Sequence, residues 1–132
     1  MNTIGGNMTY QLSFSKQEQE IRKLFRDLLS KAESMEDVKK FFYQTVRDLL
    51  KDICDPMPED VAIHDIQLDL DRGEGYLLSD SLMDGANLRP LMQDSDLDVI
   101  LERLSEHAWG RYRRLEKNPA KTESKMYPIP GR

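Results

Sequence analysis

The apolar residues of this 132-residue chain change their spacing twice. From residue 15 to 53, and again from about 95 to 117, they recur every three or four positions, which is the period of one helix face. Between these stretches, from residue 61 to 78, they alternate with polar residues, which is the period of a half-buried strand. This order predicts an α+β fold in which helices pack on one face of a small antiparallel sheet.

The first helical stretch divides into two helices. Ser15 followed by Glu18 forms a capping-box pattern, and Ser34 is a good N-cap for the second helix. Pro56 and Pro58 end the second helix, because proline cannot continue one. Since the connection is short, we expect an antiparallel helix hairpin. The two apolar stripes are Ile21, Leu24, Phe25, Leu28, Leu29 and Ala32, then Val38, Phe41, Phe42, Val46, Leu49, Leu50 and Ile53.

The alternating stretch predicts a β-hairpin. Ile66, Leu68 and Leu70 give one strand an apolar face and leave an acidic face opposite. Residues before His64 have the opposite parity, which indicates a bulge or a late strand start. The sequence RGEG at residues 72–75 predicts a turn, and residues 76–78 begin a return strand.

The region after the hairpin is less clearly patterned. Residues 84–87 (DGAN) predict another turn, and residues 88–92 fit either a third strand of a meander or a helical turn. The last helix is long, is capped by Asp94 or Ser95 with Asp96 and Asp98 in its first turn, and ends near Asn118.

The two ends of the chain lack a helical period. Residues 1–14 are expected to be flexible or to form a short strand, because Met8, Tyr10 and Leu12 alternate. Residues 118–132 contain three prolines and are expected to form a flexible C-terminal tail. The expected folded unit is therefore a single α+β domain over residues 15–117.

Charge is unevenly distributed along the chain. Residues 1–54 carry a net charge of +1, residues 55–104 carry −10 and residues 105–132 carry +4, which together give −5. Two explanations stay open: the basic end folds back near the acidic middle, or the two regions form separate partner surfaces. We favour the first.

The cellular setting is inferred from cysteine and hydropathy. The single cysteine, Cys54, cannot form an internal disulfide, which favours a reducing, cytoplasmic setting. No apolar run is long enough to cross a membrane, and residues 1–13 do not resemble a secretory signal. Cys54 is expected to be buried and not to be a nucleophile, because a helix C-terminus does not favour a thiolate.

The segment EHAWGRYRRLEK at residues 106–117 contains the interaction candidates, which are Trp109, Arg111, Tyr112, Arg113 and Arg114. Projection on a helix places Trp109 at the border of the apolar stripe and Arg113 in solvent. Arg111 projects into the stripe, so it is expected to reach a carboxylate or to emerge at an interface. Three interpretations stay open: an ordinary basic helix end, a protein–protein hot spot, or a nucleic-acid contact.

The acidic hairpin offers a weaker site. Asp65, Asp69 and Asp71 share one strand face, and the turn brings Glu74 near, which is a possible oxygen-ligand set for Mg²⁺ or Ca²⁺. A solvated edge that resists strand-to-strand aggregation explains the same charges. His64 is expected to point inward at the strand start. No catalytic or cofactor motif is found, so no enzyme, cofactor or metal site is expected.

These patterns favour a small, non-enzymatic protein–protein interaction module, an adaptor or a regulator. Its expected partner is another protein or a second copy of itself, as in a homodimer. One alternative is a regulator that contacts nucleic acid through the basic helix end and tail. The other is a metal-assisted hydrolase on the acidic hairpin.

Overall fold

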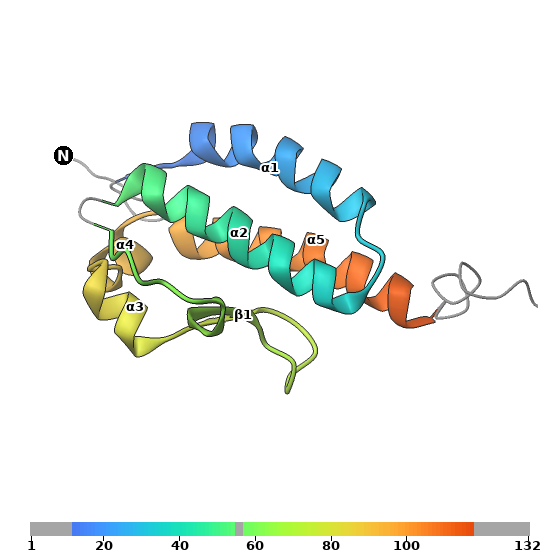
Figure 1. The fold of residues 1–132 in the computed structure, drawn as a ribbon. Coiled ribbons are helices and arrows are strands. Elements are labelled where there is room, and N and C mark those ends of the chain that lie inside the picture. The colour runs from blue at the N-terminus through green and yellow to red at the C-terminus, as the bar shows by residue number, and fades with distance from the viewer. Residues whose placement is uncertain (1–11, 55–56, 118–132) are drawn as a thin grey trace, which may run out of the picture.

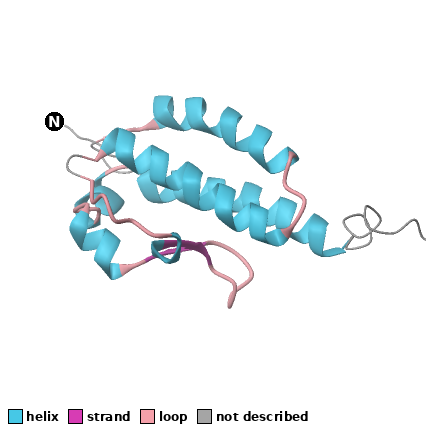
Figure 2. Cartoon of the chain, in the orientation of Figure 1, coloured by secondary structure: helices cyan, strands magenta, loops and turns pink. Residues whose placement is uncertain are grey.

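Three long helices form the bulk of the molecule, and a small hairpin packs beneath them (Figures 1 and 2). The computed structural model describes residues 12–54 and 57–117. The elements are α1 (Ser15–Ser30), α2 (Met35–Ile53), the 3₁₀ turn η1 (Ile63–Asp65), β1 (Ile66–Leu68), β2 (Tyr76–Leu78), α3 (Asp80–Gly85), α4 (Arg89–Asp94) and α5 (Leu97–Lys117). The predicted α+β class is confirmed, with helix predominating.

The predicted helix hairpin is confirmed: α1 and α2 run in opposite directions, and α5 packs against both (Figure 1). Ser34 caps α2 as predicted, because its Oγ accepts the N–H of Asp37 at 3.1 Å. Phe25 of α1 and Phe42 of α2 meet in the core with ring centroids 6.4 Å apart. The prediction that Leu24 belongs to the buried stripe of α1 is wrong. This side chain is 64% exposed, because α1 is an outer helix whose buried seam centres on Phe25 and Leu29.

The capping box predicted for α1 is wrong. Ser15 is already helical, and Glu18 turns away from the helix start to bind Arg103 of α5. Asp96 takes over the start of α1: its carboxylate accepts the backbone N–H of Phe14 at 2.8 Å and the hydroxyl of Ser13 at 3.0 Å. Since α5 begins at Leu97, Asp96 lies just before this helix and not in its first turn as predicted.

Ser95 lies two residues before the start of α5 and contacts Leu12 at the N-terminal end of the described residues. Ser95, one of the two predicted caps, accepts the N–H of Leu97 at 3.1 Å. Leu12 forms an isolated β-bridge with Ser95, while residues 1–11 lie outside the described ranges. The tail predicted at residues 118–132 lies outside them too.

The β-hairpin is confirmed but is shorter than predicted. β1 and β2 pair antiparallel in the register Ile66↔Leu78, Gln67↔Leu77 and Leu68↔Tyr76. The bulge expected near His64 is the 3₁₀ turn η1. The predicted alternation fails after Leu68: Asp69 is buried and Leu70 is 48% exposed.

The alternation of buried and exposed side chains changes at Asp69 because this residue begins the turn. Its N–H donates to the carbonyl of Gly75 at 3.1 Å, and its carbonyl accepts the N–H of Gly73 at 3.0 Å. Gly73 and Gly75 adopt φ angles of 72° and 77°, which residues with a Cβ rarely adopt. The predicted RGEG turn is thus confirmed.

The region after β2 is helical, and the option of a third strand at residues 88–92 is wrong. The short helix α3 was missed, although Ser79 before it is an N-cap whose Oγ accepts the N–H of Leu82 at 3.0 Å. Asn87, within the predicted turn, has a positive φ of 53° and separates α3 from α4. The sheet therefore has two strands in the part of the chain that the structure describes.

Asp65 fastens the hairpin to α3, which corrects the prediction that it lies on a solvated face. Its carboxylate accepts the N–H of Ala62 at 2.8 Å and the hydroxyl of Ser79 at 2.7 Å. The hydrogen bond from Ala62 is the main cause that holds the pKa of Asp65 below its usual value, and the bond from Ser79 contributes as well. The charged carboxylate is thus better stabilised in the folded chain than in the unfolded one.

Asp65→Asn is expected to lower the free energy of unfolding at pH 7 by about 1–2 kcal/mol, because charge-assisted hydrogen bonds are lost. Since the folded pKa is depressed, the contribution of Asp65 is full above the unfolded pKa of about 3.9 and is lost as pH falls through the folded value. Urea unfolding from pH 6 to pH 2 should therefore show the two proteins converging in acid. A constant difference across that range would contradict this role.

Candidate interaction surface

The predicted Trp109 cluster faces the hairpin turn. Trp109 is 5% exposed, and its Nε1–H donates to the carbonyl of Gly75 at 3.0 Å. The Arg113 guanidinium lies 5.4 Å from the centre of the Trp109 ring and donates to the carbonyl of Gly73 at 2.7 Å. The border position predicted for Trp109 is wrong, because the turn covers that flank of α5. Arg113 is exposed as predicted.

The other members of the cluster also make contacts within the chain. Arg111 Nη2 donates to the carbonyl of Ala32, just beyond α1, at 2.8 Å. It thus contacts a backbone carbonyl near a helix C-terminus, where a cation is favoured, and not the carboxylate that was one of its two expected targets. The half-buried ring of Tyr112 lies 4.8 Å from that of Trp109. Arg114 is exposed and also takes part in an interaction within the chain.

This geometry assigns the cluster a structural task. Arg113 and Trp109 hold the two turn glycines, and Arg111 holds the connection between α1 and α2. A nucleic-acid backbone would have to compete with those carbonyls for Arg111 and Arg113. The cations therefore do not form one open basic face.

The acidic hairpin residues do not gather as predicted. Asp65 and Asp69 are buried and accept hydrogen bonds from the surrounding chain, while Asp71 is exposed. Over the described ranges, no three His, Cys, Asp or Glu side chains lie close enough to hold a metal ion. The geometry thus gives the metal-assisted hydrolase no site in these residues.

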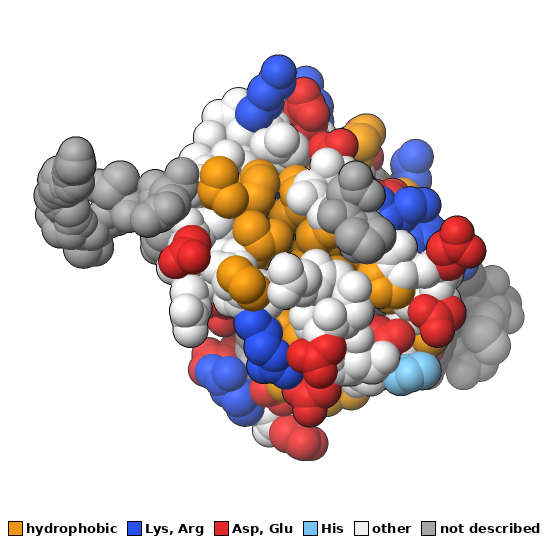
Figure 3. All heavy atoms as spheres, turned by 90° about the vertical axis from the view of Figure 1, so that its left-hand side faces the viewer, with side chains coloured by type: hydrophobic (Ala, Val, Ile, Leu, Met, Phe, Trp, Pro, Cys, Tyr) orange, Lys and Arg blue, Asp and Glu red, His pale blue; other side chains and the backbone are white. Residues whose placement is uncertain are grey.

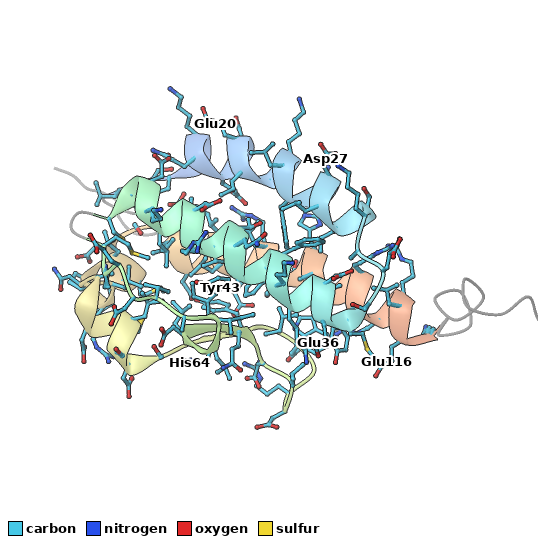
Figure 4. The ribbon with its side chains drawn as sticks, viewed as in Figure 1. Glu20, Asp27, Glu36, Tyr43, His64 and Glu116 are labelled. Carbon is cyan, nitrogen blue, oxygen red and sulfur yellow. The ribbon has the colours of Figure 1, made fainter. Side chains whose placement is uncertain are left out.

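The three remaining reactive side chains lie on different elements. His64 is exposed on η1, which corrects its predicted inward position, and Figure 4 shows it beside the hairpin. His107 of α5 is half-buried, and its pKa is lowered by burial and by Arg26 and Arg22. Cys54 ends α2 and is buried as predicted, which raises the pKa of its thiol.

Exposed apolar side chains concentrate on the hairpin. Among the described residues, six large hydrophobic side chains are exposed, and three of them belong to the hairpin or to the turn η1 that leads into it. They are Ile63 at 51%, Leu70 at 48% and Leu77 at 49%. Because Trp109 and Arg113 of α5 hold the turn of this hairpin, its exposed apolar side chains have a fixed position on the molecule.

One groove runs along the outer edge of β2 and has a volume of about 360 Å³. Its floor contains Leu78, Met83 and Met92, which are half-buried and pack against the core. Asp98 and Glu102 line it from α5. The full lining is Tyr76, Leu77, Leu78, Met83, Met92, Asp98 and Glu102.

The backbone along this groove is an open strand edge. The N–H of Asp69 donates to Gly75, and the N–H of Ser79 donates to Asp65. These two bonds identify the residue pairs of β1 and β2 that are hydrogen-bonded to each other. Because these pairs alternate in an antiparallel ladder, the N–H and C=O groups of Tyr76 and Leu78 point away from β1. A further strand can therefore pair there.

The groove is acidic as well as apolar. Asp98 and Glu102 lie one turn apart on α5, and neither forms an ion pair with a described Lys or Arg. The hydroxyl of Tyr76 donates to Asp98. Burial raises the pKa of Tyr76 strongly, and its bond to Asp98 and the negative charge of Glu102 raise it further. Arg72 Nη1 and the Glu102 carboxylate both approach Gly75, but they do not form an ion pair, so the two carboxylates of the groove remain unpaired by a described cation.

A second groove follows the edge of β1 and has a volume of about 230 Å³. Ile63 and Leu70 flank it, but its two charged side chains from α2, Glu36 and Lys39, pair with each other at 3.1 Å. It therefore offers apolar surface without a charge preference.

Hydrophobic side chains also gather at the end of the bundle where α1 begins and α2 ends (Figure 3). The β2 groove is the better defined surface, since all its lining residues are described.

No protein-family model, curated protein or solved structure matches this chain. Among the helices that the structure describes, none combines the length and the apolar character needed to cross a membrane. The functional assignment therefore depends on the geometry of the chain itself.

Proposed function

We propose that this chain is a protein–protein interaction module that binds an extended segment of a partner along the β2 edge. The observation that carries the proposal is the combination of an open strand edge, an apolar floor and two carboxylates without ion-pair partners among the described residues. Strand addition gains affinity from backbone hydrogen bonds and specificity from side-chain pockets.

The chemistry of the groove selects the partner segment. Alternate residues of an added strand share a face, so apolar side chains at every second position can reach Leu78, Met83 and Met92. Cationic side chains nearby can face Asp98 and Glu102. The partner is thus an extended segment with apolar and basic residues. The lone, buried Cys54 fits a cytoplasmic setting for such a module.

This function predicts binding of the acetylated and amidated Lys–Val octapeptide VTKTVTKT, in which Val and Lys alternate along one face of the strand. It should shift the amide NMR signals of Tyr76, Leu77 and Leu78, whereas the same peptide with Glu in place of Lys should not. Asp98→Asn/Glu102→Gln should weaken binding roughly 2- to 30-fold, since exposed ion pairs contribute about 0.2–1 kcal/mol each. Titration calorimetry and the NMR shifts measure the change.

The matched control is Glu20→Gln/Glu116→Gln, which removes two exposed carboxylates from α1 and from the far end of α5 (Figure 4). It should leave binding unchanged. Equal binding of both peptides, or an equal loss in both double variants, would exclude the β2 groove as a selective site.

A further inference from the structure

The segment that follows α5 has the composition expected of a ligand for the β2 groove. Residues 118–132 (NPAKTESKMYPIPGR) contain three cations and one carboxylate, a net charge of +2. Met126, Tyr127 and Ile129 supply apolar side chains within four positions. The segment is thus both basic and apolar.

The proline spacing of this segment suits an added edge strand. In an extended chain, the N–H and C=O groups of alternate residues point to the same edge. Pro128 and Pro130 therefore share one edge, while Tyr127 and Ile129 present their N–H groups on the other. Proline is tolerated on a strand edge that faces solvent, and there it blocks further pairing.

The segment is also long enough to return to the groove. Lys117 lies fifteen residues after Glu102 on α5, a distance of about 22 Å along the helix. The eight residues from Lys117 to Lys125 span up to about 26 Å when extended. Lys125 can therefore reach Glu102, and the residues after it can run along β2.

We propose that residues 118–132 of this chain occupy the β2 groove of the same molecule, with Tyr127 and Ile129 paired to the outer edge of β2 and Lys125 facing Glu102. This inference depends on the proposed function, because it assigns an intramolecular ligand to the same site. Tethering gives such a ligand an effective concentration of order millimolar. The segment thus regulates the module, because a partner must displace it before binding.

Hydrogen exchange in the intact chain tests this pairing with an internal control. The amides of Tyr127 and Ile129 should exchange at least tenfold more slowly than in an unstructured peptide, whereas that of Met126, on the opposite edge, should exchange freely. Asp98→Asn/Glu102→Gln should lower this protection, and Glu20→Gln/Glu116→Gln should not. Free exchange of all three amides would overturn the proposal, as would protection that rises with protein concentration, which indicates a second copy.

Binding of the Lys–Val octapeptide separates this proposal from the proposed function. Lys125→Glu should release the segment, so the octapeptide should bind that variant at least twofold more tightly than the unmodified chain. If the octapeptide bound the variant and the unmodified chain with equal affinity, and shifted the same β2 amides in both, the intramolecular ligand would be excluded. The proposed docking function would still hold. Failure of the octapeptide to bind either chain would overturn the docking function itself.

Discussion

Replacing Trp109 with alanine is expected to lower the free energy of unfolding by about 3–5 kcal/mol. The indole is 5% exposed, contacts Tyr112 and Arg113, and donates to the Gly75 carbonyl. Its removal leaves a cavity and takes one of two donors from that carbonyl, which keeps the N–H of Asp69. Urea unfolding followed by circular dichroism measures the loss, because the variant has no tryptophan fluorescence.

Two control variants separate packing from surface effects. Trp109→Phe keeps an aromatic ring but removes the hydrogen bond to Gly75, and should cost about 1–2 kcal/mol. Arg113→Ala removes an exposed cation from the same site and should cost less than about 1 kcal/mol. A change below about 0.5 kcal/mol in Trp109→Ala would mean that this side chain lies on an open surface.

Arg103→Met is expected to destabilise the chain by about 2–3 kcal/mol. Arg103 Nε and Nη2 donate to the two carboxylate oxygens of Glu18 at 2.7 Å and 2.8 Å, and the Glu18 side chain is 6% exposed. Removal of the arginine leaves that buried carboxylate without its partner. The loss is smaller than the 3–5 kcal/mol typical of a fully buried pair, since the Arg103 side chain is 44% exposed.

A double-mutant cycle isolates this interaction between α1 and α5. Glu18→Gln should cost about 1 kcal/mol, and Glu18→Gln/Arg103→Met should be about 1–2 kcal/mol more stable than the sum of the single effects. Urea unfolding at pH 7 measures all four proteins. Strictly additive losses would show that the two side chains do not depend on each other.

Local sequence patterns predicted the elements well where local forces determine them. Ser34 caps α2 as expected because the bond to Asp37 spans only three residues. The RGEG turn follows from the positive φ angles that Gly73 and Gly75 adopt. The α+β layout followed from the change of hydrophobic period.

Predictions failed where a distant residue supplies the competing partner. Glu18 leaves its predicted capping role because Arg103, 85 positions away, binds both its oxygens. Trp109 becomes buried because the turn at Gly75 covers it, which a helix projection cannot show. The failure at Asp69 is a local one, because this residue closes the hairpin turn through Gly73 and Gly75.

The β2 groove could not be read from the sequence for the same reason. Asp98 and Glu102 signal a charged helix face, but their position beside Leu77 depends on how the hairpin and α5 pack. Met83 and Met92 reach the floor through two short helices, of which α3 was missed. The sequence did show the acidic middle and the basic end of the chain, which the proposed intramolecular ligand brings together.

The most direct test of the docking surface is the pattern of intermolecular nuclear Overhauser effects between the isotope-labelled chain and the Lys–Val octapeptide. A peptide strand paired along β2 should place its backbone protons close to the amide protons of Tyr76 and Leu78, and its valines close to Leu78, Met83 and Met92. Contacts confined to other elements, or to the β1 edge at Ile66 and Leu68, would contradict the account.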